Sequence, residues 1–175
     1  MAANPINTLL AGRTVVVKDN VSVAGLPTTL GIRAWLHSKS GKYQPSPIDA
    51  TVVRRLLLAG ATLKGTAVCE SYSAAPVSFT SAIGAVHNPW AQSHAAGGSS
   101  SGCAALVGER AVLEESDSAI NGFHQGPPTV ELAVGGDQGG SIRVPAACTG
   151  VYGLKPMHGL VPYTEAISLT PMIDH

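Results

Sequence analysis

Charged residues are scarce in this sequence of 175 residues. Asp, Glu, Lys and Arg make up 13% of it, with 11 acidic and 11 basic residues and no net charge. No basic stripe or acidic tail predicts nucleic acid or a charged membrane surface as a partner. No apolar run reaches the roughly 18 residues that span a bilayer, and the N-terminal residues do not read as a secretory signal. We therefore expect a cytoplasmic protein.

Cysteine and histidine are also few and widely spaced. Cys69, Cys103 and Cys148 are an odd number at spacings that suit neither a disulfide framework nor a CxxC metal site. We interpret them as small buried thiols in a reducing compartment. His87 and His94 lie close in sequence, but nothing nearby supplies a third ligand at a recognisable spacing. The sequence therefore predicts no metal site.

The apolar segments that are present predict an α/β fold. The β-branched run Thr14–Val17 is typical of a buried strand. We expect a helix capped by residues 49–51 and closed by Gly60, and then a short strand over 61–65. A helix between two apolar strands indicates a mixed, largely parallel sheet covered by helices. No linker divides the chain, so we expect a single domain.

Two Gly/Ser-rich segments border buried elements. Residues 97–102 read GGSSSG and lead into an expected small-residue helix, and residues 135–140 read GGDQGG and lead from an apolar run to Ser141. Glycines let the backbone approach a small group and point N–H groups at it, so Ser141 can be a nucleophile if a base lies nearby. Ordinary Gly-rich turns remain the alternative. The first segment lacks the Gly-Lys-Ser/Thr ending of a phosphate loop.

Lys18 ends the first expected strand, where a lysine is unusual because lysines are rarely buried unless paired or functional. The alternative is a stem that packs while the ammonium reaches water. Residues 66–96 read mostly as loop, and 108–129 concentrate charge and end in a Pro-Pro pair, which predicts an inserted excursion without chemistry. Residues 158–163 predict a strand and a turn.

Three motifs stand in order along the chain: Val-Lys18-Asp-Asn, Gly-Gly-Ser99-Ser-Ser-Gly, and Gly-Gly-Asp-Gln-Gly-Gly-Ser141-Ile-Arg-Val-Pro-Ala. Together they resemble the amidase signature family of amide hydrolases, in its bacterial and fungal amidase branch. The resemblance runs from about Arg13 to the C-terminus, apart from 108–129. It implies that residues 1–175 are the N-terminal part of a single amidase signature domain that is incomplete at the C-terminus.

The resemblance also implies the site. Ser141 would attack the amide carbonyl, Ser99 after a non-proline cis peptide would relay the proton, and Lys18 would be the base, since burial disfavours its charged form. Backbone N–H groups would form an oxyanion hole: Gln138, Gly139, Gly140 and Ser141. The substrate would be a small-molecule amide, with no metal or organic cofactor, and we expect that the full-length protein can form a homodimer.

Some residues depart from the family pattern, and two other functions stay open. Ser101 replaces a usual glycine, and Cys148-Thr149 replaces a Phe-Cys pair. Ser141 lies 42 positions after Ser99, a longer separation than usual, because of the expected insertion. One alternative is an amidotransferase A-type subunit serving tRNA-dependent amidation, although Gln138 favours the free amidase. The other is a truncated, catalytically inactive amidase-like fragment.

Overall fold

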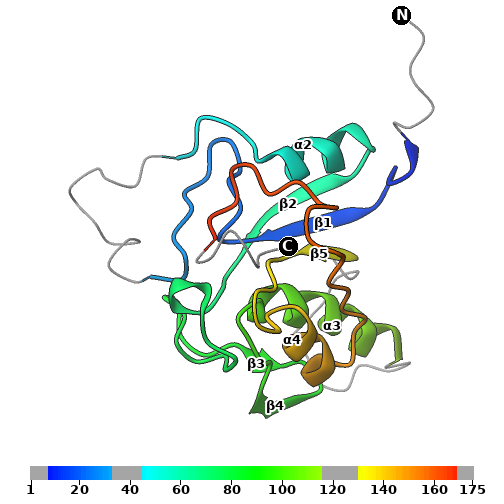
Figure 1. The fold of residues 1–175 in the computed structure, drawn as a ribbon. Coiled ribbons are helices and arrows are strands. Elements are labelled where there is room, and N and C mark those ends of the chain that lie inside the picture. The colour runs from blue at the N-terminus through cyan, green and yellow to red at the C-terminus, as the bar shows by residue number, and fades with distance from the viewer. Residues whose placement is uncertain (1–7, 33–44, 116–129, 169–175) are drawn as a thin grey trace, which may run out of the picture.

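A three-stranded parallel sheet forms the centre of the protein (Figure 1). The structure, a computed structural model, describes residues 8–32, 45–115 (backbone alone from 110) and 130–168. The strands are β1 (Thr14–Lys18), β2 (Thr62–Ala67) and β5 (Leu132–Val134), in the order β2-β1-β5. Both neighbours run parallel to β1. The expected α/β fold with a parallel sheet is therefore confirmed for the described residues.

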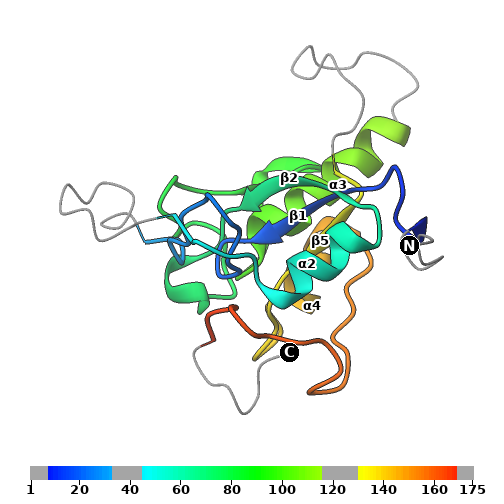
Figure 2. The same cartoon turned by 90° about the horizontal axis from the view of Figure 1, so that it is seen from above.

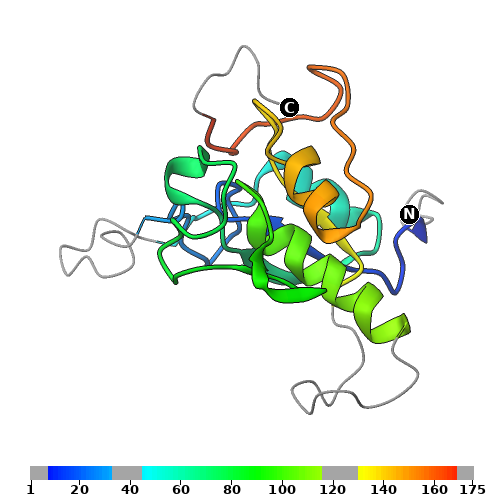
Figure 3. The same cartoon turned by 90° about the horizontal axis from the view of Figure 1, so that it is seen from below.

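Helices cover both faces of this sheet. Helix α2 (Thr51–Leu58) lies over one face, as the view from above shows (Figure 2). Helices α3 (Ser101–Glu115) and α4 (Arg143–Thr149) lie side by side on the opposite face (Figure 3). A hairpin of β3 (His87–Asn88) and β4 (Ala91–Ala95) adjoins the end of α4 through a hydrogen bond from Asn88 to the Cys148 carbonyl. None of the helices in the described ranges combines the length and the apolar character needed to cross a bilayer.

Strand β1 is buried on both faces, which explains its continuous run of valines. Val17 is 0% exposed and packs with Val53 in the cluster beneath α2. Val16 faces the other way and packs with Cys103 of α3. Fully burying a side chain of this kind contributes about 1.5–3 kcal/mol. The strand that ends in Lys18 therefore lies in the core of the protein.

The βαβ unit forms as expected, but its cap does not. Helix α2 begins after Ala50, and no side chain caps it. The Asp49 carboxylate accepts the backbone N–H of Ala24 at 2.7 Å instead, so it ties the preceding loop to the helix entry. The chain leaves the helix through Gly60, whose φ of 91° favours glycine.

Three predicted segments differ from the structure. Residues 108–115 continue α3 rather than beginning an excursion, and the rest of the predicted insertion, 116–129, lies outside the described residues. The expected loop 66–96 contains the β3–β4 hairpin. Residues 158–163 form a turn without a strand. An isolated bridge to Val21 forms further along the chain, at Ala166.

The last described segment returns to the end of β1 (Figure 1, orange to red). Ser22 N–H donates to the Glu165 carbonyl at 3.0 Å, and Ile167 N–H donates to the Asn20 carbonyl at 2.7 Å. This segment therefore covers the chain immediately after Lys18.

Candidate active site

The Lys18 side chain is buried and bound to Ser99. The residue is 1% exposed, and its Nζ donates to Ser99 Oγ at 2.8 Å. A lysine whose ammonium reached water would not have this burial, so the structure excludes the alternative that the sequence left open. Two of the three predicted triad residues are in direct contact.

The hydroxyl of Ser99 has two hydrogen-bond partners. It accepts from Lys18 Nζ and donates to the backbone carbonyl of Ser73 at 2.7 Å. Ser99 is itself 0% exposed, and the Gly98–Ser99 peptide is cis, the one such bond recorded in the described ranges. In this state the hydroxyl hydrogen points at Ser73, and Lys18 is the donor.

A strained turn provides the Ser73 carbonyl. Tyr72 and Ser73 both have positive φ, 56° and 59°, which is uncommon for residues other than glycine. The Tyr72 N–H donates to the Leu30 carbonyl at 2.9 Å, which fixes this turn against the loop that follows β1. Ser73 could not be found from the sequence, because a backbone carbonyl leaves no signal in the identity of its residue.

Asp19 fixes that loop. Its buried carboxylate accepts the N–H groups of Thr29 at 2.8 Å and Gly31 at 3.4 Å, and also the Thr29 hydroxyl. Burial raises the pKa of Asp19, although these hydrogen bonds oppose the rise. Leu30 N–H donates to the Asp19 carbonyl at 3.1 Å. The residue after Lys18 thus anchors the loop that holds the Ser73 turn.

Ser141 lies beside the Ser99 segment. Its backbone carbonyl accepts the N–H of Ser100 at 3.1 Å. Gly135 packs closely there, because an added Cβ would lie 2.7 Å from Ser100 Oγ. The two Gly/Ser-rich segments therefore meet, although Ser99 and Ser141 are 42 positions apart in the sequence.

Asp137 organises the loop before Ser141. Its carboxylate accepts the N–H groups of Gly140 at 2.7 Å, Ile142 at 3.1 Å and Arg143 at 3.2 Å, and the Arg143 guanidinium at 3.0 and 2.9 Å. Burial disfavours the charged form, but these hydrogen bonds outweigh it and hold the pKa of Asp137 well below its usual range. The Gly140 N–H is thereby directed at Asp137.

Two of the remaining predicted oxyanion residues, Gln138 and Gly139, lie nearer to solvent. Gln138 is half-buried, and its Nε2 donates to Ser168 Oγ at 2.7 Å, which ties the loop to the last described segment. Gly139 is exposed, and an added Cβ there would meet nothing within 4 Å. In the described residues, no three side chains of the His, Cys, Asp and Glu types gather as metal ligands would. His87 and His94 are exposed.

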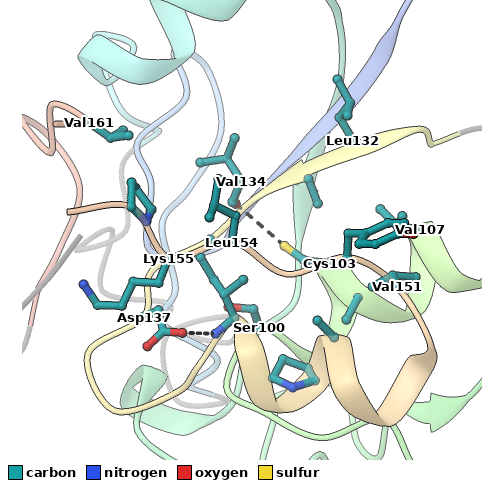
Figure 4. Close-up of a pocket in the computed structure, with 18 of the residues that line it drawn as sticks. Ser100, Cys103, Val107, Leu132, Val134, Asp137, Val151, Leu154, Lys155 and Val161 are labelled. Atoms are coloured by element: carbon teal, nitrogen blue, oxygen red, sulfur yellow. Dashed lines mark hydrogen bonds between the residues drawn. The ribbon is translucent and has the colours of Figure 1, made fainter. Parts of the chain in front are cut away.

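An apolar pocket of about 740 Å³ adjoins the Gly-rich loop. Figure 4 shows its wall, where Cys103 of α3 approaches the Val134 carbonyl of β5. Ser100 and Asp137 line the pocket, whereas Lys18, Ser99 and Ser141 do not. Ser100 Oγ is buried, and among the described residues it has no hydrogen-bond partner.

Comparisons of sequence point to one family. The amidase family model matches residues 2–115 and 128–175. An enantioselective amidase of Rhodococcus rhodochrous is 49% identical over 168 residues, which are 95% of this chain and 28% of that protein. The A-type subunit of the glutamyl-tRNA(Gln) amidotransferase of Haloarcula marismortui is 45% identical over 152 residues, which are 87% of this chain and 30% of that protein.

A comparison of structures agrees. The peptide amidase of Stenotrophomonas maltophilia matches with a TM-score of 0.76 at 29% identity, over 97% of this chain and 31% of that chain. The chain therefore spans less than a third of the length of each of these relatives. With the family model matched on both sides of the 116–127 gap and the signature motifs in order, the chain belongs to the amidase signature family.

Proposed function

We propose that this chain carries the catalytic residues of a serine amide hydrolase. The observation that carries the proposal is the buried hydrogen bond of 2.8 Å between Lys18 Nζ and Ser99 Oγ, next to the loop that presents Ser141. A buried lysine bound to a hydroxyl is suited to proton transfer, because burial favours its neutral form. The relatives named as amidases support the same reaction.

Proton transfer begins with a rotation of the Ser99 hydroxyl. In the resting state its hydrogen points at the Ser73 carbonyl. When Lys18 is neutral, the hydroxyl turns its hydrogen to Nζ and accepts the hydrogen of Ser141. Ser141 Oγ then attacks the amide carbon while two protons move in sequence, which leaves Lys18 as the ammonium and the former carbonyl oxygen as an oxyanion.

The oxyanion requires N–H donors aimed at its position. The resemblance implies Gln138, Gly139, Gly140 and Ser141, but Gly140 N–H donates to Asp137 at 2.7 Å. We therefore assign the role to the N–H groups of Gln138, Gly139 and Ser141, with Gly140 shaping the turn through its φ of 123°. One such donor is worth about 3 kcal/mol of transition-state stabilisation.

Collapse of the tetrahedral intermediate breaks the carbon–nitrogen bond. The proton on Lys18 returns through Ser99 to the leaving nitrogen, which departs as ammonia or an amine. Water then attacks the Ser141 ester by the same relay and releases the carboxylic acid. The chemistry needs no metal or organic cofactor.

The substrate class is a small-molecule carboxylic amide. For the whole protein, the homodimer and the cytoplasmic location stay predictions from the sequence. The alternative is an amidotransferase A-type subunit, because one relative with that name is 45% identical. Hydrolysis of glutamine that requires added partner subunits would favour this alternative.

Covalent labelling tests the proposal. The chain is incubated with an activated phosphonate and its intact mass is measured, with Ser141→Ala as the test variant and Ser46→Ala as the matched control. We expect one adduct in the wild type and in Ser46→Ala, and none in Ser141→Ala. If the folded wild-type chain gains no adduct, it is an inactive amidase-like chain. Its membership of the family then reflects ancestry and not activity.

A further inference from the structure

Glu70 is a fully buried carboxylate that this mechanism does not use. The residue is 0% exposed, and a buried charge is costly unless hydrogen bonds stabilise it. Oε2 accepts the backbone N–H and the hydroxyl of Thr80, both at 2.7 Å. Oε1 accepts the Ser101 hydroxyl at 2.7 Å. Three donors therefore meet the two oxygens of one side chain.

The Glu70 side chain is the acceptor in each of these hydrogen bonds. Thr80 Oγ1 accepts the backbone N–H of Ser71 at 3.2 Å, so its own hydrogen is available for Glu70. Glu70 therefore accepts hydrogen bonds from Thr80 in a loop and from Ser101 at the start of α3.

The backbone of Glu70 bonds both to the backbone of Ser99 and to Ser73, whose carbonyl accepts the Ser99 hydroxyl. Its N–H donates to the Ser99 carbonyl at 3.1 Å, and its carbonyl accepts the N–H of Ser73 at 2.7 Å. Ser73 is the residue whose carbonyl accepts the Ser99 hydroxyl hydrogen. A shift of Glu70 would therefore move the Ser99 backbone and the acceptor of its hydroxyl together.

We propose that Glu70 is a positioning residue for the Ser99 relay. Its carboxylate fixes residues 99–101 through Ser101, and its backbone fixes the turn that ends at Ser73. Glu70 does not contact the reacting atoms, so it acts by setting where Ser99 Oγ lies relative to Lys18 Nζ. The catalytic part of this inference rests on the proposed function, whereas the effect on the loop does not.

Three variants and a control separate positioning from general stability. Glu70→Ala removes all three side-chain hydrogen bonds, and Ser101→Ala removes one. Glu70→Gln keeps an oxygen for Thr80 and places its amide toward Ser101, whose hydroxyl can accept. The control is Glu131→Ala, because Glu131 also accepts several hydrogen bonds, from Arg13 and Thr14, at the opposite end of β1.

The first readout is hydrogen exchange of the backbone amides of residues 98–102 in the full chain, read by mass spectrometry. The N–H groups of Gly98, Ser100 and Gly102 donate to backbone carbonyls in the structure. We expect exchange about tenfold faster in Glu70→Ala and a smaller increase in Ser101→Ala, with Glu70→Gln near the wild type. Glu131→Ala should not selectively increase the hydrogen-exchange rate of these amides. The proposal is overturned if exchange is unchanged in both Glu70→Ala and Ser101→Ala. If Glu70→Ala does not fold, unchanged exchange in Ser101→Ala alone overturns it.

The second readout is the rate of phosphonate labelling at Ser141 as the probe concentration rises. We expect Glu70→Ala to lower the maximal rate by about 100-fold with little change in the half-saturating concentration, and Glu70→Gln to restore most of it. Equal losses in Glu70→Ala and Glu131→Ala would overturn the catalytic part. If the wild type is not labelled, the proposed function fails, and the exchange experiment still decides whether Glu70 positions the loop.

Discussion

Gly98 has no room for a side chain where it precedes Ser99. An added Cβ would collide with the carbonyl oxygens of Val77 and Ala75, which are backbone atoms and cannot swing aside. We therefore expect Gly98→Ala to lower Tm by about 2–12 °C, because overpacking of this kind costs about 1–3 kcal/mol. Thermal unfolding followed by circular dichroism measures the change. Gly139→Ala is the control, since its Cβ would meet nothing within 4 Å, and equal Tm values for the two variants would contradict the packing argument.

The three cysteines differ in their access to solvent. Cys69 and Cys103 are buried and Cys148 is exposed. Burial raises the pKa of both Cys69 and Cys103 to about 12, so neither forms a thiolate near pH 8. We expect one equivalent of a thiol reagent to react with the native chain at pH 8, none with Cys148→Ser, and three with the denatured chain. Rapid reaction of all three in a chain with a native circular dichroism spectrum would contradict this prediction.

At the scale of an element, the loop from Gly135 to Arg143 depends on one carboxylate. The hydrogen bonds to Asp137 lower its pKa in the folded state below the value of about 3.9 expected in the unfolded chain. The carboxylate therefore stabilises the folded state above that unfolded value, and this contribution is lost as the pH falls toward the folded-state pKa.

Replacing the Asp137 carboxylate with the uncharged amide of asparagine isolates the contribution of its charge to stability. Urea unfolding should show Asp137→Asn less stable than the wild type by about 1–3 kcal/mol at pH 6. The difference should shrink as the pH falls below about 4. Asp49→Asn provides the control, because Asp49 binds one N–H group at the entry to α2. A difference between wild type and Asp137→Asn that is the same at pH 6 and pH 3 would show that the charge is not the cause.

At the scale of the whole molecule, apolar surface remains around the pocket beside β5. Leu132 is 40% exposed and Leu154 is 79% exposed, and both line the pocket of about 740 Å³. Exposed apolar surface of this kind promotes association or binds apolar ligands. We expect the chain to bind an apolar fluorescent dye such as anilinonaphthalene sulfonate, and Leu154→Glu to weaken that binding several-fold. Leu9→Glu, an exposed leucine away from the pocket, is the control, and an equal loss in both variants would contradict the assignment.

The sequence predicted much of the fold, whereas the catalytic roles of the site residues stay a prediction. The valine run predicted β1 because a strand buried on both faces is apolar at every position. The segment after α2 and the Gly-rich loops were also placed correctly. Residues 108–115 were assigned to an excursion because their charges suggested solvent, yet they continue α3. Charge indicates exposure, and an exposed stretch can still be helical.

By itself the sequence determined the family, the parallel sheet and the residue types at Lys18, Ser99 and Ser141, because motif order and apolar periodicity are local properties. Only the tertiary structure showed that Lys18 is buried against Ser99, that Ser73 accepts the Ser99 hydroxyl, and that Asp137 takes the Gly140 N–H. The reason is physical: these contacts join residues distant in sequence, or use backbone atoms that every residue type shares.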